Sequence, residues 1–151
     1  MKETQIHGYQ IASKSKRFIA ALIEALIFST IILLIYLALG KTVSKFWNDI
    51  NSDFKLLDIS ISFISGVIAG ALLYPFFTGN LGHKICNLKV ILEETGEDYK
   101  KPEKGALREG LKAVLGYLII PSIWILWDKK NQNLYDKITK TLVVEKNIKN
   151  N

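Results

Sequence analysis

The sequence predicts an all-α membrane protein, with two helices that cross the bilayer and a third, shorter apolar segment. Apolar residues make up 49% of the 151 residues, and the formal net charge is +6. The charged residues crowd into separate blocks, and the segments between these blocks are almost free of charge. In a soluble protein, charged and apolar residues alternate closely along the chain, so this separation into blocks indicates an integral membrane protein. We expect a polar lead-in over 1–12, one membrane domain over 13–146 and a polar tail over 147–151.

The first predicted membrane helix runs from about Ser15 to Leu39. Ser13 or Ser15 would be its N-cap, and Gly40 would end it. Its apolar part, Phe18–Leu39, has about 22 residues, which suits a hydrocarbon core about 30 Å thick. A signal sequence has an apolar run of roughly 7–15 residues, so we interpret this segment as an uncleaved helix.

The second predicted membrane helix covers about Leu56 to Phe77. Small residues recur in it at a spacing of four, which leaves a flat strip that another helix can approach closely. The first helix carries a similar strip, and ordinary packing of one strip on the other is expected. The strips consist of Ser62, Gly66 and Gly70 in the second helix and of Ala20, Ala21 and Ala25 in the first.

The third apolar stretch, 113–127, leaves two topologies open. It has about 15 residues where a span needs about 20, and Pro121 interrupts it. As a third span, it would place the basic C-terminal tail outside the cell, against the positive-inside tendency. As a re-entrant or interfacial helical segment bent at Pro121, it would leave every strongly basic block, and both chain termini, in the cytoplasm. The second topology is favoured.

Two short segments predict a small cytoplasmic β pairing. Residues 88–94, "LKVILEE", and residues 141–146, "TLVVEK", both resemble strands. Neither segment has another partner in the sequence, and a lone strand is unstable. Pairing them requires that both lie on one side of the membrane, which also favours the re-entrant topology.

An acid in the first apolar helix requires an explanation. Glu24 would cost roughly 3 kcal/mol in hydrocarbon without a partner. Arg17 lies two turns before it on the same helical face. The candidates to complete the set are Arg108 or a lysine of the basic segment 84–112, and Asp136. We therefore predict a charge cluster of Arg17, Glu24, Arg108 and Asp136.

Four blocks of sequence resemble, in order, the RDD family of small bacterial membrane proteins. They are "SKRFIAALIEAL", "NLGHKICNLKVI", "ALREGLK" and "NLYDKITKTLVV". The resemblance maps the arginine and the two aspartates of the family name onto Arg17, Glu24 and Asp136. Glu24 keeps the carboxylate of the first aspartate with one more methylene, and His83 replaces the usual lysine of the second block. The resemblance to the family implies a multi-pass protein of the bacterial inner membrane.

The resemblance and the residues leave three functions open. The first is a structural ion network in a membrane assembly module, since a paired buried charge is retained without any transport. The second is exchange of sodium or potassium for protons by a homo-oligomer, which the resemblance implies for some members and which a buried carboxylate would suit. The third is an accessory subunit of a larger membrane complex, docked through the open edge of the predicted strands.

Other classes of function find no support in the sequence. Cys86 is the only cysteine, so no disulfide within the chain is expected. The only histidines are His7 and His83, so no metal site is expected either. The chain has no catalytic triad, phosphate-binding loop or dinucleotide fingerprint, so neither enzyme activity nor a cofactor is expected. Its lysines flank apolar segments, which favours anionic lipid over nucleic acid as the partner, with His83, Lys84 and Lys89 as candidate interface residues.

Overall fold

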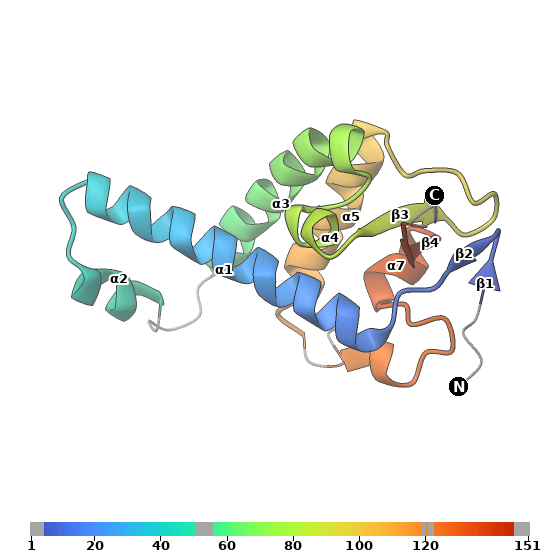
Figure 1. Cartoon of the computed structure of the whole chain (residues 1–151). Coiled ribbons are helices and arrows are strands. Elements are labelled where there is room, and N and C mark those ends of the chain that lie inside the picture. The colour runs from blue at the N-terminus through green and yellow to red at the C-terminus, as the bar shows by residue number, and fades with distance from the viewer. Residues whose placement is uncertain (1–4, 51–55, 119, 121–122, 147–151) are drawn as a thin grey trace.

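The computed structural model describes residues 5–50, 56–118, 120 and 123–146. The chain is mostly helical, and a small sheet lies at one end (Figure 1). Its elements are β1 (Gln5–Ile6), β2 (Tyr9–Gln10), α1 (Lys14–Ala38), α2 (Val43–Ile50), α3 (Leu56–Phe77), α4 (Leu81–Ile85), β3 (Leu88–Leu92), α5 (Pro102–Leu115), the 3₁₀-helix η1 (Trp124–Leu126), α7 (Leu134–Ile138) and β4 (Thr141–Glu145).

Two segments are long and apolar enough to cross a membrane. They are Lys14–Ala38, which is α1, and Ile59–Ile85, which contains most of α3. Within the most apolar window of each segment only 11% of the residues are buried, so these side chains face outward rather than into a protein core. Such exposure is expected when hydrocarbon is the solvent.

The ends of α1 follow the predicted capping. The side chain of Ser13 accepts a hydrogen bond from the Lys16 amide, as an N-cap does. At the other end Gly40 has a φ of +70°, the left-handed conformation that ends a helix and that glycine adopts without strain. The predicted bounds of this helix therefore differ from the observed ones by one residue at each end.

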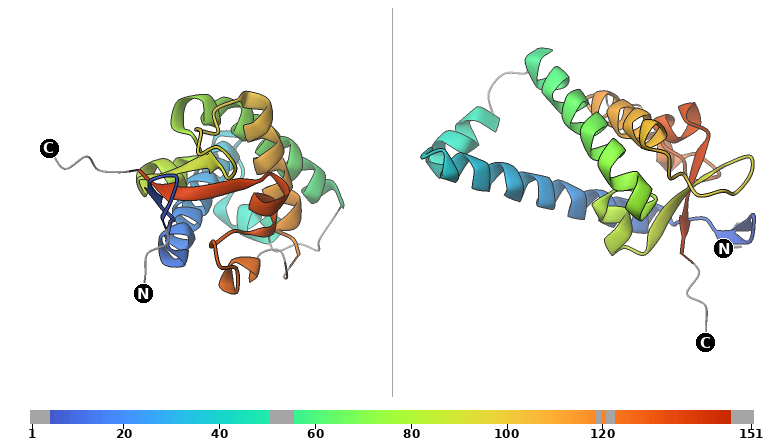
Figure 2. Two further views of the ribbon diagram at one scale, coloured as in Figure 1. Left: turned by 90° about the vertical axis from the view of Figure 1, so that its right-hand side faces the viewer. Right: turned by 90° about the horizontal axis from the view of Figure 1, so that it is seen from above.

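The small residues of α3 pack on α5, not on α1. A side chain at Gly70 would collide with the carbonyl of Gly105, and one at Gly66 would collide with that of Glu109. From α1, Ala20 contacts Gly82 of α4 instead. The expectation that the strips of the two membrane helices pack together is therefore wrong. The helices α1 and α3 converge toward the sheet end and separate away from it (Figure 2).

The predicted strand pairing is confirmed. Strands β3 and β4 are antiparallel, with Leu88 opposite Glu145 and Leu92 opposite Thr141. Both outer edges are covered within the described chain. The Ala12 amide donates to the carbonyl of Val143 in β4, and the Tyr99 amide donates to that of Val90 in β3. The sheet therefore lacks the open edge that the subunit hypothesis required.

The N-terminal residues contribute to this end of the fold. Strands β1 and β2 form a hairpin, with Gln5 opposite Gln10. Ile11 forms a bridge with Val144, and Ala12 is fully buried. Residues 5–12 of the expected polar lead-in therefore pack on the sheet, and the sequence did not predict this contact. Residues 1–4 and the tail 147–151 lie outside the described residues.

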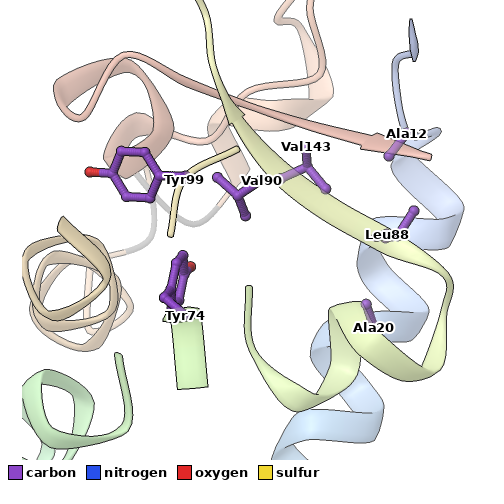
Figure 3. Close-up of a cluster of buried hydrophobic side chains, with 7 residues drawn as sticks. All are labelled: Ala12, Ala20, Tyr74, Leu88, Val90, Tyr99 and Val143. Carbon is purple, nitrogen blue, oxygen red and sulfur yellow. The ribbon is translucent and has the colours of Figure 1, made fainter. Parts of the chain in front are cut away.

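A hydrophobic core joins the sheet to the helices (Figure 3). Leu88 and Val90 of β3 face Val143 of β4, and Tyr74 at the end of α3 meets Tyr99 edge-on with ring centroids 6.0 Å apart. Ala12 and Ala20 complete the cluster from the N-terminal side. This core fixes the sheet to the ends of α1 and α3.

The third apolar stretch leaves the sheet end and returns to it. Helix α5 runs antiparallel to α3 and reaches the level of Ser62, whose hydroxyl lies 2.7 Å from that of Tyr117. The chain then comes back, because the Leu126 carbonyl accepts a hydrogen bond of 2.5 Å from Lys14 at the start of α1. Pro121, where the bend was predicted, lies outside the described residues. This path agrees with the re-entrant alternative.

Candidate functional site

Five buried side chains and one half-buried side chain, that of Lys112, form a line of alternating charges at the sheet end, here called the charge chain. It consists, in order, of Arg17, Asp136, Arg108, Glu109, Lys112 and Glu24. Arg17 and Arg108 each lie 2.5 Å from an oxygen of Asp136, Arg108 lies 3.1 Å from Glu109, and Glu109 lies 3.3 Å from Lys112. Lys112 in turn pairs with Glu24. Three cations face three acids, so the charge chain has no net charge.

Asp136 links the C-terminal part of the chain to the helices. It lies in the first turn of α7, where its Oδ2 accepts a hydrogen bond of 2.8 Å from the Asn133 amide. Its side chain is fully buried, and burial by itself would raise its pKa. The positive charges of Arg17 and Arg108 outweigh this effect and hold the pKa of Asp136 below its ordinary value.

Helix α5 supplies the middle of the charge chain. Arg108 and Lys112 are four residues apart, so both project from the same face of the helix. Arg108 also donates to the hydroxyl of Tyr74 at 2.5 Å, and that hydroxyl donates to Glu109 at 2.6 Å. Since Tyr74 belongs to α3, the charge chain connects α1, α3, α5 and α7.

The partners of Glu24 explain how this acid is accommodated. Its Oε2 accepts hydrogen bonds from Lys112 and from the Asn80 side chain, the latter at 2.8 Å. Arg17, which was expected to lean toward Glu24, bonds Asp136 instead and stands at the other end of the charge chain. The four predicted residues therefore lie in one network, but Glu24 does not pair with any of the other three.

Several members of the network were missed in the sequence. Glu109, Tyr74 and Asn80 were not proposed, and Lys112 was covered only as one of the lysines of the basic segment 84–112. Glu109 and Lys112 follow Arg108 within one turn of the same helix, and this spacing is the signal that could have found them. Tyr74 and Asn80 carry no comparable signal, because their roles depend on how α3 and α4 approach the other helices.

The three predicted lipid-interface residues lie in different surroundings. His83 is 6% exposed and helps Asn80 to cap α4, so headgroups reach little of it. Lys84 is exposed, with its ammonium 5.6 Å from the centre of the Phe77 ring. Lys89 lies 2.7 Å from Asp98, which raises the pKa of the lysine although burial opposes the change.

Two cavities meet at the Glu24 end of the charge chain. The first, here the polar cavity, has a volume of about 140 Å³. The second, here the apolar groove, has about 410 Å³ and runs between α1 and α3. Ala21, Glu24 and Lys112 line both. The polar cavity is further lined by Lys14, Arg17, Phe18, Asn80, His83, Ile125, Asn133 and Tyr135.

The chemistry available at this site is that of charge pairing. Among the described residues, no three His, Cys, Asp or Glu side chains come together in a way that could hold a metal ion. Each acid of the charge chain already has a cationic partner. The arrangement therefore suits the exchange of one ionic partner for another, or a purely structural role.

Comparison with known proteins agrees with the blocks noted in the sequence. No curated protein and no solved structure matches the chain. The sequence profile of the RDD family matches residues 11–140, which include every member of the charge chain. The chain therefore belongs to the RDD family.

Proposed function

We propose that this chain is a membrane assembly module in which the charge chain has a structural role. It would fasten the sheet and the folded-back C-terminal segment onto the membrane helices. The observation that carries this proposal is Asp136, which is fully buried and bonds Arg17 from α1 and Arg108 from α5 at 2.5 Å each. A carboxylate held by two guanidinium groups has little freedom to change partners.

Replacement of one charge tests this proposal. Asp136→Asn keeps the shape of the side chain but leaves two arginines facing a neutral group. We expect a loss of about 3 kcal/mol in the free energy of unfolding, because a buried charge network that loses one partner leaves the others uncompensated. Thermal unfolding of the purified protein in detergent, followed by circular dichroism, measures the loss.

Asp98→Asn is the matched control. Asp98 also bonds two cations, Lys89 at 2.7 Å and Lys100 at 3.2 Å, but its side chain is 31% exposed. Pairs of this kind contribute about 0–1 kcal/mol. Equal losses in the two variants would contradict a special structural role of the charge chain.

Exchange of a monovalent cation for a proton is the second candidate, and one observation favours it. Glu24 and Lys112 line both cavities, so their ion pair lies where the polar cavity and the apolar groove meet. An exchanger would need Glu24 to leave Lys112 and take a proton or a cation. In proteoliposomes, a sodium or potassium gradient would then drive proton flux in the wild type and in Glu94→Gln, an exposed control, but not in Glu24→Gln. Absence of flux in the wild type would exclude this candidate.

The location proposed for the module is the bacterial inner membrane, with the sheet end in the cytoplasm. This orientation follows from the positive-inside tendency, because the long basic segments 84–112 and 128–146 lie at or near the sheet end. Anionic lipids, further copies of the chain or a larger membrane complex would be its partners. A complex would have to dock elsewhere than on the covered edges of the sheet.

A further inference from the structure

The polar cavity and the apolar groove follow one another along α1. Lys14, Arg17 and Phe18 line only the polar cavity, and Ala25, Phe28 and Ile32 line only the groove. Between these two sets lie Ala21 and Glu24, which line both. A molecule that occupied both would therefore have its polar end at the start of α1 and its apolar end deeper in the membrane.

The dimensions of the groove identify the apolar part of such a molecule. From Ala21 to Ile32 α1 rises about 16 Å, which is about half of a hydrocarbon core and so the depth of one leaflet. A volume of 410 Å³ over that length gives a mean cross-section of about 25 Å². The groove therefore has the length and width to accommodate one hydrocarbon chain.

The polar cavity identifies the other part. Its lining includes the cations Lys14, Arg17 and Lys112; the last two belong to the neutral charge chain, so Lys14 supplies the excess positive charge. Within the described part of the chain, Lys14 makes no ion pair and bonds only the carbonyl of Leu126. An occupant that carries negative charge would therefore pair with Lys14.

We propose that these two cavities form a binding site for one anionic phospholipid. The phosphate lies beside Lys14, and one acyl chain passes Ala21 into the groove as far as Ile32. This site is specific to one lipid molecule, unlike the general attraction of lysines to an anionic bilayer. It is independent of whether the charge chain is structural or exchanges ions.

Native mass spectrometry of the full chain in detergent tests the proposal. The probes are phosphatidylglycerol, phosphatidylcholine with the same acyl chains, single-chain lysophosphatidylglycerols of increasing length, and inorganic phosphate. We expect one retained phosphatidylglycerol per chain, at least tenfold weaker retention of phosphatidylcholine, and affinity that rises with chain length until the groove is full. Inorganic phosphate should neither bind nor compete, because a free anion lacks the acyl chain.

Two matched pairs of variants locate the lipid. Ala25→Leu places a larger side chain in the groove and should weaken retention about tenfold, since it displaces about two methylene groups. Ala38→Leu makes the same change in the exposed outer end of α1 and should have no effect. Lys14→Gln should weaken retention of phosphatidylglycerol about fivefold, whereas Lys16→Gln, which removes a pair with Glu145, should not.

Several results would overturn the proposal. They are equal retention of the two diacyl lipids, affinity independent of chain length, binding of inorganic phosphate alone, or equal behaviour within either pair of variants. A dimer mass in place of a lipid-bound monomer would show that a second copy fills the groove. Because the lipid series uses only the wild-type chain, it tests the proposed lipid site even if a variant does not fold.

Discussion

The two ends of α1 lie in opposite surroundings. Its first half is packed by α4, α5 and the C-terminal segment, and Arg17, Ala20 and Glu24 are buried there. Its outer part is apolar and exposed: Leu34, for example, is 59% exposed. One end of the helix therefore contacts a protein core, and the other presents an apolar surface. The comparison shows that the two buried charges of α1, Arg17 and Glu24, lie where opposite charges from other elements meet them.

The same contrast separates the sheet end from the outer end of the whole molecule. At the sheet end, residues distant in sequence meet, as Glu24 and Lys112 do across 88 positions. At the outer end, α1 and α3 spread apart, and α2 follows α1 along the chain (Figure 2). Packing therefore holds the first region, whereas the apolar side chains of the second face outward.

Accessibility from outside the cell provides the sharpest test of this contrast. In a Cys86→Ser background, Lys140→Cys would place a thiol at the sheet end and Lys45→Cys would place one in α2. An impermeant thiol reagent added to intact cells should label the second and leave the first unlabelled. As a control, both variants should be labelled after the membrane is permeabilised. Labelling of Lys140→Cys in intact cells would contradict the proposed orientation.

Leucine truncation at the two ends should differ next most strongly. Leu88 is fully buried in the core of the sheet end, so Leu88→Ala should cost about 3 kcal/mol in the free energy of unfolding. Leu34→Ala removes the same atoms from a surface that would face hydrocarbon in the folded and in the unfolded state alike. It should therefore cost less than about 1 kcal/mol. Denaturation in detergent measures both, and similar costs would mean that the outer end is also packed against protein.

Acid should weaken the sheet end by a smaller amount. The folded state holds the pKa of Asp136 below its ordinary value, so its contribution is fully present above about pH 4, the unfolded value. It is lost as the pH falls through the lower, folded pKa. The difference in melting temperature between the wild type and Asp136→Asn should therefore be constant above about pH 4 and narrow as the pH falls below it. A constant difference would show that Asp136 is not the group that titrates.

Much of the local structure could be predicted from the sequence. The bounds of α3 agree with the prediction, and those of α1 agree to one residue. The pairing of 88–94 with 141–146 followed from two strand-like segments that had no other partner. The short helices α2, α4 and α7 were not predicted, because polar and glycine-containing stretches of this length resemble connections.

The partners of the charged residues could not be predicted in the same way. Arg17 and Glu24 share a helical face, which favours their pairing, yet each bonds a residue from another element. The sequence showed the strip of small residues in α3. It did not show which helix packs on this strip, since α1 and α5 both contain small residues. Helical periodicity shows which side chains share a face, and it does not show what approaches that face.

The sequence by itself determined which segments are apolar, how long they are and where they end, because these properties depend on neighbouring residues and on the thickness of a bilayer. It also determined the family, through blocks that keep their order. The tertiary structure alone decided that Glu24 pairs with Lys112 and that Asp136 joins two arginines. Lysines and arginines are equivalent candidates in a sequence, and only the packing of α1, α5 and α7 brings one of them within reach of each acid.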